Sequence, residues 1–369
     1  MADQAVPFAH LSAQHQSMAV ELRDAVSRVM ESGRFILGPE VEAFEREFAR
    51  VAGTSDAIGV ASGTDALTLS LWALDVRSGD EVITTPLTAT FTALAISRTG
   101  AKPVFADVDR RSLTLAPASV AEKLSSRTKA ILPVHLYGNL CDMPALLEIA
   151  DRAGIVVVED ACQAHAATLR DRPAGAWGRA GCFSFYPTKN LGALGDGGLI
   201  ATNDRDLASR LRRLRNGGQE SRYVHREAGF NSRLDEMQAA VLRAKLPHLA
   251  AWTERRRYLA SLYRRHLEKA PLVWVDSLPQ AASACHLMVA RVPDRDRLQS
   301  ALKEAGVQTL IHYPIPAHLQ PAYEDLGQPA GSCPEAERAA GEILSLPLYP
   351  ELSEAQVEHV ARTILEFYR

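Results

Sequence analysis

Short apolar runs alternate with amphipathic helical patterns over the first two thirds of this 369-residue chain. The runs predicted as strands are rich in β-branched residues and cover residues 58–61, 81–85, 103–106, 130–134, 155–158, 181–185 and 198–202. The predicted helices cover about residues 17–30, 39–51, 64–74, 92–98 and 143–153, and a further one begins after residue 117. Parallel strands joined through helices form a sheet that is covered on both faces. We therefore predict an α/β fold with a large, mostly parallel, seven-stranded sheet.

The pattern changes near residue 250. Residues 235–270 are almost entirely helical, with an interruption at Pro247. A predicted strand at 287–292, a helix at 294–305, a strand at 308–311 and a closing helix at 353–368 follow. We predict a large α/β domain over residues 1–250, with a helical segment at its N-terminus, and a smaller C-terminal α/β domain over residues 251–369.

The composition argues against several classes of protein. Basic and acidic residues nearly balance, 41 against 44, so no strong field would recruit nucleic acid or an anionic membrane. Five scattered cysteines without a C-x-x-C pair argue against a disulfide framework or a zinc ribbon. The first residues lack the apolar core of a secretory signal, and the apolar runs are far too short to span a bilayer. We expect a cytoplasmic protein that binds neither nucleic acid nor membranes.

Two carboxylates, Glu159 and Asp160, directly follow the apolar run at 155–158. Ligands of open α/β sheets bind at the carboxyl ends of the strands. An acid at such an end either caps a helix or turn, or is a buried partner for a cation. The run alone leaves both interpretations open.

An aromatic strand, Phe183-Ser184-Phe185-Tyr186, runs into Lys189 and then into a glycine-rich loop. Lysine is rarely buried without a partner. At an apolar strand end the ammonium is disfavoured, and the neutral amine is a nucleophile able to form an imine. The alternative is a surface lysine that precedes a glycine turn.

The segment Ser62-Gly63-Thr64 lies where a short strand turns into a helix. Its free N–H groups and hydroxyls are suited to a phosphate, although a simple helix cap would use the same residues. The chain has neither a nucleotide P-loop nor the glycine fingerprint of a Rossmann fold. An imine-forming lysine, a carboxylate that keeps a pyridine nitrogen protonated, and a phosphate cradle are the parts that a pyridoxal phosphate (PLP) site requires.

Taken in order, the motifs of this chain resemble those of the DegT/DnrJ/EryC1/StrS sugar aminotransferases, which are fold type I PLP-dependent enzymes. The resemblance covers nearly the whole chain. It is carried by the segment around Lys189 and by residues 33–41 (GRFILGPEV), 62–67 (SGTDAL), 133–138 (PVHLYG), 159–165 (EDACQAH), 229–233 (GFNSR) and 311–314 (IHYP). Cys162 departs from the family, which usually has alanine there.

The resemblance implies a role for each matching residue. Lys189 carries the cofactor as a Schiff base and shuttles the proton, and Asp160 pairs with the pyridinium nitrogen. Gln163 lies against the ring and its 3-hydroxyl, and Phe91 is the aromatic side chain stacked on the ring.

Other matches concern the phosphate of the cofactor. Gly63, Thr64 and Ser184 hold it, and an asparagine matching Asn231 reaches it from the neighbouring subunit. The resemblance therefore implies a homodimer with shared active sites.

Residues of the expected sugar-nucleotide cleft are Tyr186, Arg215, Tyr223, His225, His312, Tyr313 and His318. The arginines at 210–215 and at 255–257 fit a solvated helix face, but Arg215 and its neighbours also have the bidentate geometry that suits a diphosphate. A metal site at His312 and His318 is not expected, because zinc needs three or four converging ligands.

The expected reaction is transfer of an amino group from L-glutamate to a nucleotide-linked keto-sugar. The loop after Lys189 reads Asn-Leu-Gly-Ala-Leu-Gly-Asp-Gly-Gly. It resembles family members that act at C3, whereas those that act at C4 more often carry Thr-Thr-Gly-Glu-Gly-Gly. We therefore expect a 3-keto-6-deoxyhexose linked to thymidine diphosphate (dTDP), with a 4-keto sugar as the alternative.

Three further alternatives are weaker. PLP-dependent sugar dehydratases of the family carry histidine at the lysine position. A non-enzymatic PLP-binding regulator would not need the full set of lysine, aspartate and phosphate cradle. A dehydrogenase shares the sheet architecture, but fold alone does not fix function, and its glycine fingerprint is absent.

Overall fold

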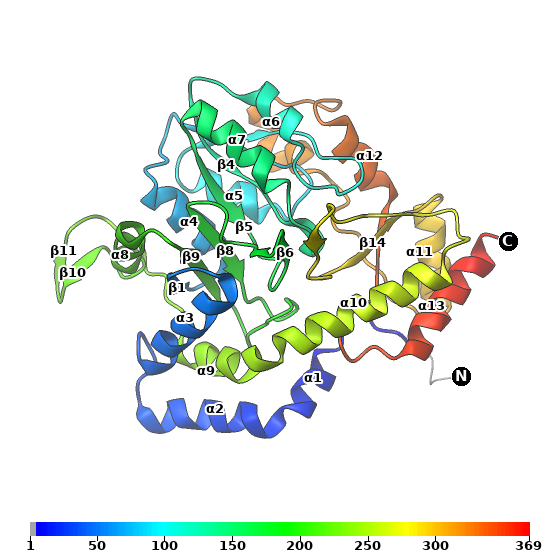
Figure 1. Cartoon of the computed structure of the whole chain (residues 1–369), viewed down its shortest axis with the longest axis horizontal. Coiled ribbons are helices and arrows are strands. Elements are labelled where there is room, and N and C mark those ends of the chain that lie inside the picture. Colours follow the sequence, from blue (N-terminus) through cyan, green and yellow to red (C-terminus); the bar gives the residue numbers. More distant parts are fainter. Residues whose placement is uncertain (1–4) are drawn as a thin grey trace.

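The computed structural model describes residues 5–369 (Figure 1). Its central sheet has seven strands in the order β1-β9-β8-β5-β4-β2-β3. Their bounds are β1 (Asp56–Val60), β2 (Glu81–Thr84), β3 (Lys102–Phe105), β4 (Thr128–Leu132), β5 (Val156–Asp160), β8 (Ala180–Ser184) and β9 (Gly198–Thr202). Only β9 runs antiparallel to its neighbours, β1 and β8. The predicted seven-stranded, mostly parallel sheet is confirmed.

Helices cover both faces of this sheet. They are α3 (Pro39–Ala52), α4 (Gly63–Ala73), α5 (Phe91–Ser97), α6 (Pro117–Lys123), α7 (Met143–Ala153) and α8 (Arg205–Leu214). The first two helices, α1 (Leu11–Ser17) and α2 (Ala19–Ser32), lie outside these layers, and α2 packs on α9 (Glu236–Lys245) (Figure 1). Successive residues of one strand point to opposite faces, so Ile83 packs in the core with Phe44 and Leu146, and Val82 packs in the core with Leu67 and Leu211. Both faces are therefore apolar, as expected for parallel strands.

Helix α9 (Glu236–Lys245) explains why the segment at 33–41 takes its shape. The buried carboxylate of Glu236 accepts the N–H groups of Gly38, Glu40 and Val41, at 2.8–2.9 Å. These are donors at the start of α3 that have no partner within the helix. Pro39 occupies the first helical position, where a missing N–H costs nothing.

After η3 (Leu246–His248), the long helix α10 (Leu249–His266) runs from the large sheet to a small antiparallel sheet (Figure 1). That sheet has the order β12-β14-β15. The elements of this region are β12 (Val273–Trp274), β14 (Met288–Arg291), α11 (Arg295–Glu304), α12 (Pro334–Glu342), β15 (Ile343–Leu346) and α13 (Glu354–Phe367). Because α10 is continuous across residue 250, the boundary between residues 250 and 251 stays a prediction.

Residues 308–311 were predicted as a strand, and this prediction is wrong. Leu310 makes only a single bridge to Ser345. The backbone of Gln308 pairs instead with Val6, near the N-terminus. The edge of the small sheet is formed by β15, whose four residues are all buried.

The remaining elements are short. They are the strands β6 (Thr168–Leu169), β7 (Arg172–Pro173), β10 (Gln219–Ser221), β11 (Val224–His225) and β13 (Ala281–Ala282), and the 3-10 helices η2 (Leu136–Gly138), η4 (Ala317–Leu319) and η5 (Pro321–Leu326). Strands β10 and β11 form a hairpin that projects from the body of the molecule beside α8 (Figure 1). Within residues 5–369, no helix is both long and apolar enough to cross a membrane.

Candidate active site

The two carboxylates at the end of β5 have different surroundings. Glu159 is fully buried, bonds to His135 Nε2 at 2.8 Å and accepts the N–H groups of Gly175, Trp177 and Gly178. These contacts use its oxygens to hold a turn of the chain. Of the two interpretations that the sequence left open for these acids, Glu159 fits both, because it holds a turn and is also the buried partner of His135.

Asp160 ends β5 on the opposite side of the strand and is 5% exposed. Thr92 Oγ1 donates to Asp160 Oδ2 at 2.8 Å, and the N–H of Cys162 donates to Oδ1 at 3.2 Å. A carboxylate held in place by two donors is available to a further cationic N–H group. Asp160 is thus a buried carboxyl group held in a fixed position at the carboxyl end of the sheet.

Lys189 follows the adjacent strand, β8, and its N–H closes a turn to the carbonyl of Tyr186 at 2.8 Å. Burial lowers the pKa of its ammonium below the ordinary value, and the neighbouring Cys162 and Asp160 oppose this shift. The same ammonium lowers the pKa of His165, after the larger effect of burial. Lys189 therefore has the environment of a nucleophilic amine, and it lies near the Asp160 carboxylate.

The backbone of the loop after Lys189 is fixed by contacts with Pro187, with α9 and with Ala284. A Cβ on Gly192 would lie 2.2 Å from the carbonyl oxygen of Pro187, so only glycine fits there. Lys245 Nζ, a buried ammonium of α9, donates to the Gly192 carbonyl at 2.8 Å. Asn190 Nδ2 donates to the Ala284 carbonyl at 2.8 Å. These contacts fix the backbone that carries Lys189.

The start of α4 is pressed against the ends of β5 and β8. A Cβ on Gly63 would lie 2.7 Å from Ser184 Cβ and 2.9 Å from Cys162 Sγ. Ser62 Oγ caps the N–H of Asp65 at 3.1 Å, whereas the N–H groups of Gly63 and Thr64 find no acceptor within residues 5–369. Free N–H groups at a helix N-terminus beside a serine hydroxyl are suited to a phosphate.

A closed set of hydrogen bonds joins the large sheet to the later part of the chain. Gln163 Oε1 accepts the N–H of Tyr137 at 2.7 Å, and Gln163 Nε2 donates to Tyr313 Oη at 3.2 Å. Tyr137 Oη in turn donates to the His312 carbonyl. The orientation of Gln163 is therefore set by residues from both parts.

Lys189 also lines a cavity of about 280 Å³. Tyr186, which follows β8, and His312, in the later part of the chain, line it as well. His312 Nδ1 contacts Ser345 Oγ at 2.9 Å, and burial followed by the charge of Lys189 lowers the pKa of His312 to about 4. Of the residues expected in the sugar-nucleotide cleft, Tyr186, His312 and Tyr313 thus lie around Lys189 or Gln163.

Two other expected cleft residues lie elsewhere. Arg215 is 8% exposed, forms an ion pair with Glu45 and donates to the Gly59 carbonyl at 2.9 Å. His318 is 2% exposed, and its Nε2 contacts Glu337 Oε1 at 3.0 Å. We correct the expectation that both line the sugar-nucleotide cleft, because each side chain is buried and contacts a glutamate of this chain.

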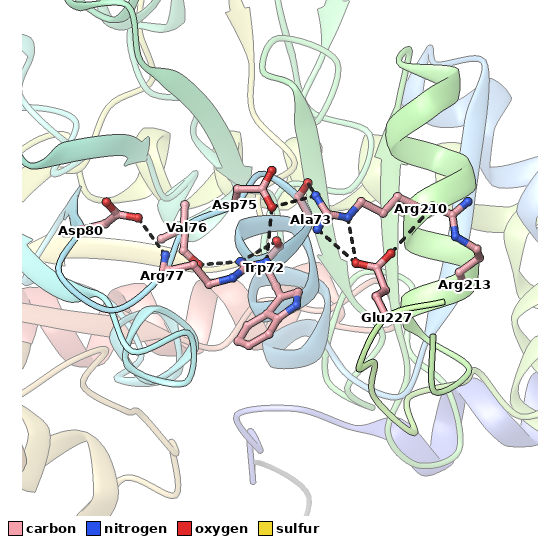
Figure 2. A network of polar contacts seen from close by, with 9 residues as sticks. All are labelled: Trp72, Ala73, Asp75, Val76, Arg77, Asp80, Arg210, Arg213 and Glu227. Atoms are coloured by element: carbon pink, nitrogen blue, oxygen red, sulfur yellow. Dashed lines mark hydrogen bonds and ion pairs between the residues drawn. The ribbon is translucent and has the colours of Figure 1, made fainter. Parts of the chain in front are cut away.

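The other arginines of the 210–215 cluster are also paired. Figure 2 shows Arg210 between Asp75 and Glu227, at 2.9 and 3.1 Å, while Arg213 approaches the same glutamate at 3.8 Å. Arg212 pairs with Asp56 at 2.9 Å. This cluster fixes helix α8 and the base of the hairpin, and it does not present the free cations that a diphosphate would need.

Tyr223 and His225 lie on the β10–β11 hairpin. Tyr223 is 77% exposed, and His225 Nδ1 bonds to the Gly217 carbonyl at 2.7 Å. Asn231, just after the hairpin, is exposed and bridges to Asn216. Phe91, at the start of α5, is 61% exposed. None of these four is enclosed in the single chain.

Two residues near the site were missed. Thr92 holds Asp160, and its position after Phe91 gave no signal for this. Arg256 lines the Lys189 cavity and is 7% exposed, which makes the expectation of a solvated face for residues 255–257 wrong at this position. The helical period on α10 was the available signal, because Arg256 is in phase with the buried Thr253, Leu259 and Ala260.

Comparison with known proteins identifies the family. The model of the DegT/DnrJ/EryC1/StrS aminotransferase family matches residues 16–365. Erythromycin biosynthesis sensory transduction protein EryC1 of Saccharopolyspora erythraea is 51% identical over 360 residues, which is 97% of this chain and 98% of that protein. The dTDP-3-amino-3,4,6-trideoxy-alpha-D-glucose transaminase of Streptomyces venezuelae is 47% identical over 363 residues, which is 98% of this chain and 96% of that protein.

A solved structure agrees with these relatives. That of S. venezuelae DesV, in complex with a ketimine intermediate, is 47% identical and covers 98% of each chain with a TM-score of 0.96. The chain therefore belongs to the DegT/DnrJ/EryC1/StrS aminotransferase family, and it is a PLP-dependent aminotransferase.

Proposed function

We propose that this enzyme transfers the amino group of L-glutamate to C3 of a dTDP-linked 3-keto-6-deoxyhexose, at a site built on Lys189 and Asp160. The observation that carries the site is the convergence of these two groups with the start of α4 at one end of the sheet. A fixed carboxylate, a buried amine and unpaired helix N–H groups match the three polar ends of PLP.

The residues present fit this cofactor. Asp160 would face the pyridine nitrogen, and the N–H groups of Gly63 and Thr64 with Ser184 Oγ would hold the phosphate. The cradle is shaped for it, since the Cβ of any residue larger than Gly63 would collide with Ser184. PLP, when bound, supplies an electron sink that labilises the proton on the substrate carbon bearing the nitrogen.

The side chains around the cofactor have distinct tasks. Lys189 Nζ would hold the cofactor covalently, and its amine would carry a proton to and from the substrate. Its lowered pKa favours the neutral form that this task needs. Gln163, held by Tyr137 and Tyr313, would orient the ring through its 3-hydroxyl.

The acceptor follows from the relatives and from the loop after Lys189. The Streptomyces venezuelae transaminase is named for a dTDP-3-amino sugar. The loop Asn190–Gly198 of this chain resembles that of members that act at C3. Because this loop lies beside Lys189, it can determine which carbonyl of the sugar ring reaches the amine.

The active unit would be a homodimer in which Asn231 completes the phosphate site of the partner. Exposed apolar side chains support a second copy, since α5 exposes Phe91 and Leu94 and the hairpin exposes Tyr223 and Val224. A closed two-fold dimer would cover such surfaces. The same contact would bring Phe91 and the hairpin into an enclosed site.

A panel of 3-keto and 4-keto dTDP-sugars with L-glutamate tests the reaction. Mass spectrometry and proton NMR of the products should show amination at C3, and the enzyme should show an absorbance band in the near-visible range that borohydride removes. Preferential amination at C4 would reject the acceptor. A protein that binds PLP but aminates no sugar would favour a regulatory function.

A further inference from the structure

Arg256 is a buried cation without a counter-ion. Its side chain comes from the middle of α10 and is 7% exposed. Within residues 5–369, no carboxylate lies within 4 Å of its guanidinium. Burial lowers the pKa of Arg256 to about 10, and the more distant Glu351 opposes this shift. A buried charge with no partner is costly unless a ligand supplies one.

All hydrogen bonds of the Arg256 guanidinium within the described residues come from one nitrogen, Nη1. Nη1 donates to the carbonyl groups of Leu348, His286 and Cys285, at 2.7, 3.2 and 3.5 Å. Nε is buried and has no hydrogen-bond partner within the described chain. Nη2 makes no hydrogen bond within the described residues either, so the Nε–Nη2 edge has no partner, and this edge of an arginine binds a carboxylate through two parallel hydrogen bonds.

Two other arginines differ from Arg256 in one decisive respect. Arg213 and Arg215 also have a buried Nε without a partner. However, Arg215 pairs with Glu45, and Arg213 lies 3.8 Å from Glu227. Arg256 lacks such a carboxylate and lines a cavity.

That cavity also contains Lys189. Its lining includes Lys189, Arg256, His286 and His312, and Glu351 is the one acid among the described lining residues. Its volume of about 280 Å³ is below the range of roughly 300–1,000 Å³ that suits a drug-sized ligand. A nucleotide sugar is too large for it, whereas an amino acid is of a suitable size.

We propose that the free edge of Arg256 binds a carboxylate of the amino donor, L-glutamate, in this cavity. This inference rests on the proposed transamination, since Lys189 marks the place where the amine of the donor reacts. Glu351 disfavours an anion in the cavity, so binding depends on the arginine. The donor is thereby recognised by α10 and not by the strand ends that hold the cofactor.

Calorimetric titration of the PLP-loaded enzyme with glutarate, a dicarboxylate without an amine, tests the subsite. Arg256→Lys keeps the positive charge but cannot make the bidentate contact with a carboxylate. It should weaken glutarate binding about 10- to 100-fold. Glu351→Gln should strengthen binding several-fold. Arg265→Gln, an exposed arginine on the same helix, is the matched control and should leave the affinity unchanged.

Binding of dTDP in the same variants separates the two possible anions. The affinity for dTDP should be unaffected by Arg256→Lys. If this variant instead lost affinity for dTDP and kept its affinity for glutarate, the proposal would be overturned. Unchanged glutarate affinity in a folded Arg256→Lys enzyme would also overturn it. If Arg256→Lys does not fold, Glu351→Gln decides, because unchanged or weaker glutarate binding rejects the subsite. Intact glutarate binding without sugar amination refutes the proposed acceptor and leaves the subsite standing.

Discussion

The clearest structural test of the phosphate cradle is Gly63→Ala. Gly63 does not adopt a positive φ, so alanine is allowed by the backbone. The added Cβ would lie 2.7 Å from Ser184 Cβ, 2.9 Å from Cys162 Sγ and 3.2 Å from Ser184 Cα. The last contact is to backbone, so strand β8 and helix α4 must separate by several tenths of an ångström.

The magnitude follows from two opposing effects. Overpacking of this kind costs about 1–3 kcal/mol. Replacement of glycine by alanine in a helix contributes up to about 1 kcal/mol of stability. The free energy of unfolding should therefore fall by roughly 1–2 kcal/mol. PLP should bind about tenfold more weakly, since moving Ser184 weakens one hydrogen bond to a charged group.

Urea unfolding and PLP titration measure both effects. Gly341→Ala is the matched control, because a Cβ at this exposed helical position meets nothing within 4 Å and should leave the protein as stable or slightly more stable. Adding Cys162→Ala to Gly63→Ala should recover part of the loss, since the Sγ contact is removed and the Ser184 contact remains. If Gly63→Ala behaved like Gly341→Ala in both assays, the cradle would not be packed as described.

Four further outcomes are expected. Lys189→Ala should fold and lose transamination entirely, because no other lysine of the described residues lines its cavity; substantial turnover would move the covalent attachment elsewhere. Asp160→Asn should keep some PLP but lose most activity, as a neutral amide does not stabilise the protonated ring; activity within a few-fold of wild type would contradict this. Mixing Lys189→Ala with Asn231→Ala subunits should restore one site per heterodimer, and verified exchange without recovery would exclude shared sites. Burial lowers the pKa of Lys245 from 10.5 to about 8, so between these pH values the unfolded chain binds more protons than the folded one. From pH 8 to 10.5, the free energy of unfolding of the wild type should therefore rise relative to that of Lys245→Met. Urea unfolding at a series of pH values measures both, and the same pH dependence in the two proteins would refute the reasoning.

The helices and strands of the large sheet were well predicted, because the periodicity of their apolar residues reflects burial on both faces of the sheet. The strand β9 was expected at 198–202 and lies there, and α7 was expected at 143–153 and lies there. The strand at 308–311 failed because its backbone partner, Val6, is about 300 residues away in the sequence. A short edge segment carries no signal for which distant chain segment it will pair with.

The proposed site was predicted to the extent that strand ends determine it. Asp160 and Ser184 end two strands that proved to be neighbours, so parallel pairing brings them to one edge. The expectations for Arg215 and His318 failed for a different reason. Glu45 is 170 residues from Arg215, and no local pattern shows that it neutralises this cation. Sequence gives the sign of a charge, but whether that charge is already paired depends on the tertiary fold.

The division of labour between the two parts of the chain follows from these contacts. The strand ends of the large sheet provide Asp160, Ser184 and Lys189, and their packing tolerates little change, as the fit around Gly63 shows. The later part of the chain provides Tyr313, which contacts Gln163, and Arg256, which lines the Lys189 cavity. Substitutions of Arg256 can therefore change how a substrate is held while leaving the cofactor contacts intact. For this reason we expect variation in donor preference within the family to arise on α10 and the loop at 311–314, and variation in the sugar carbon to arise in the loop after Lys189.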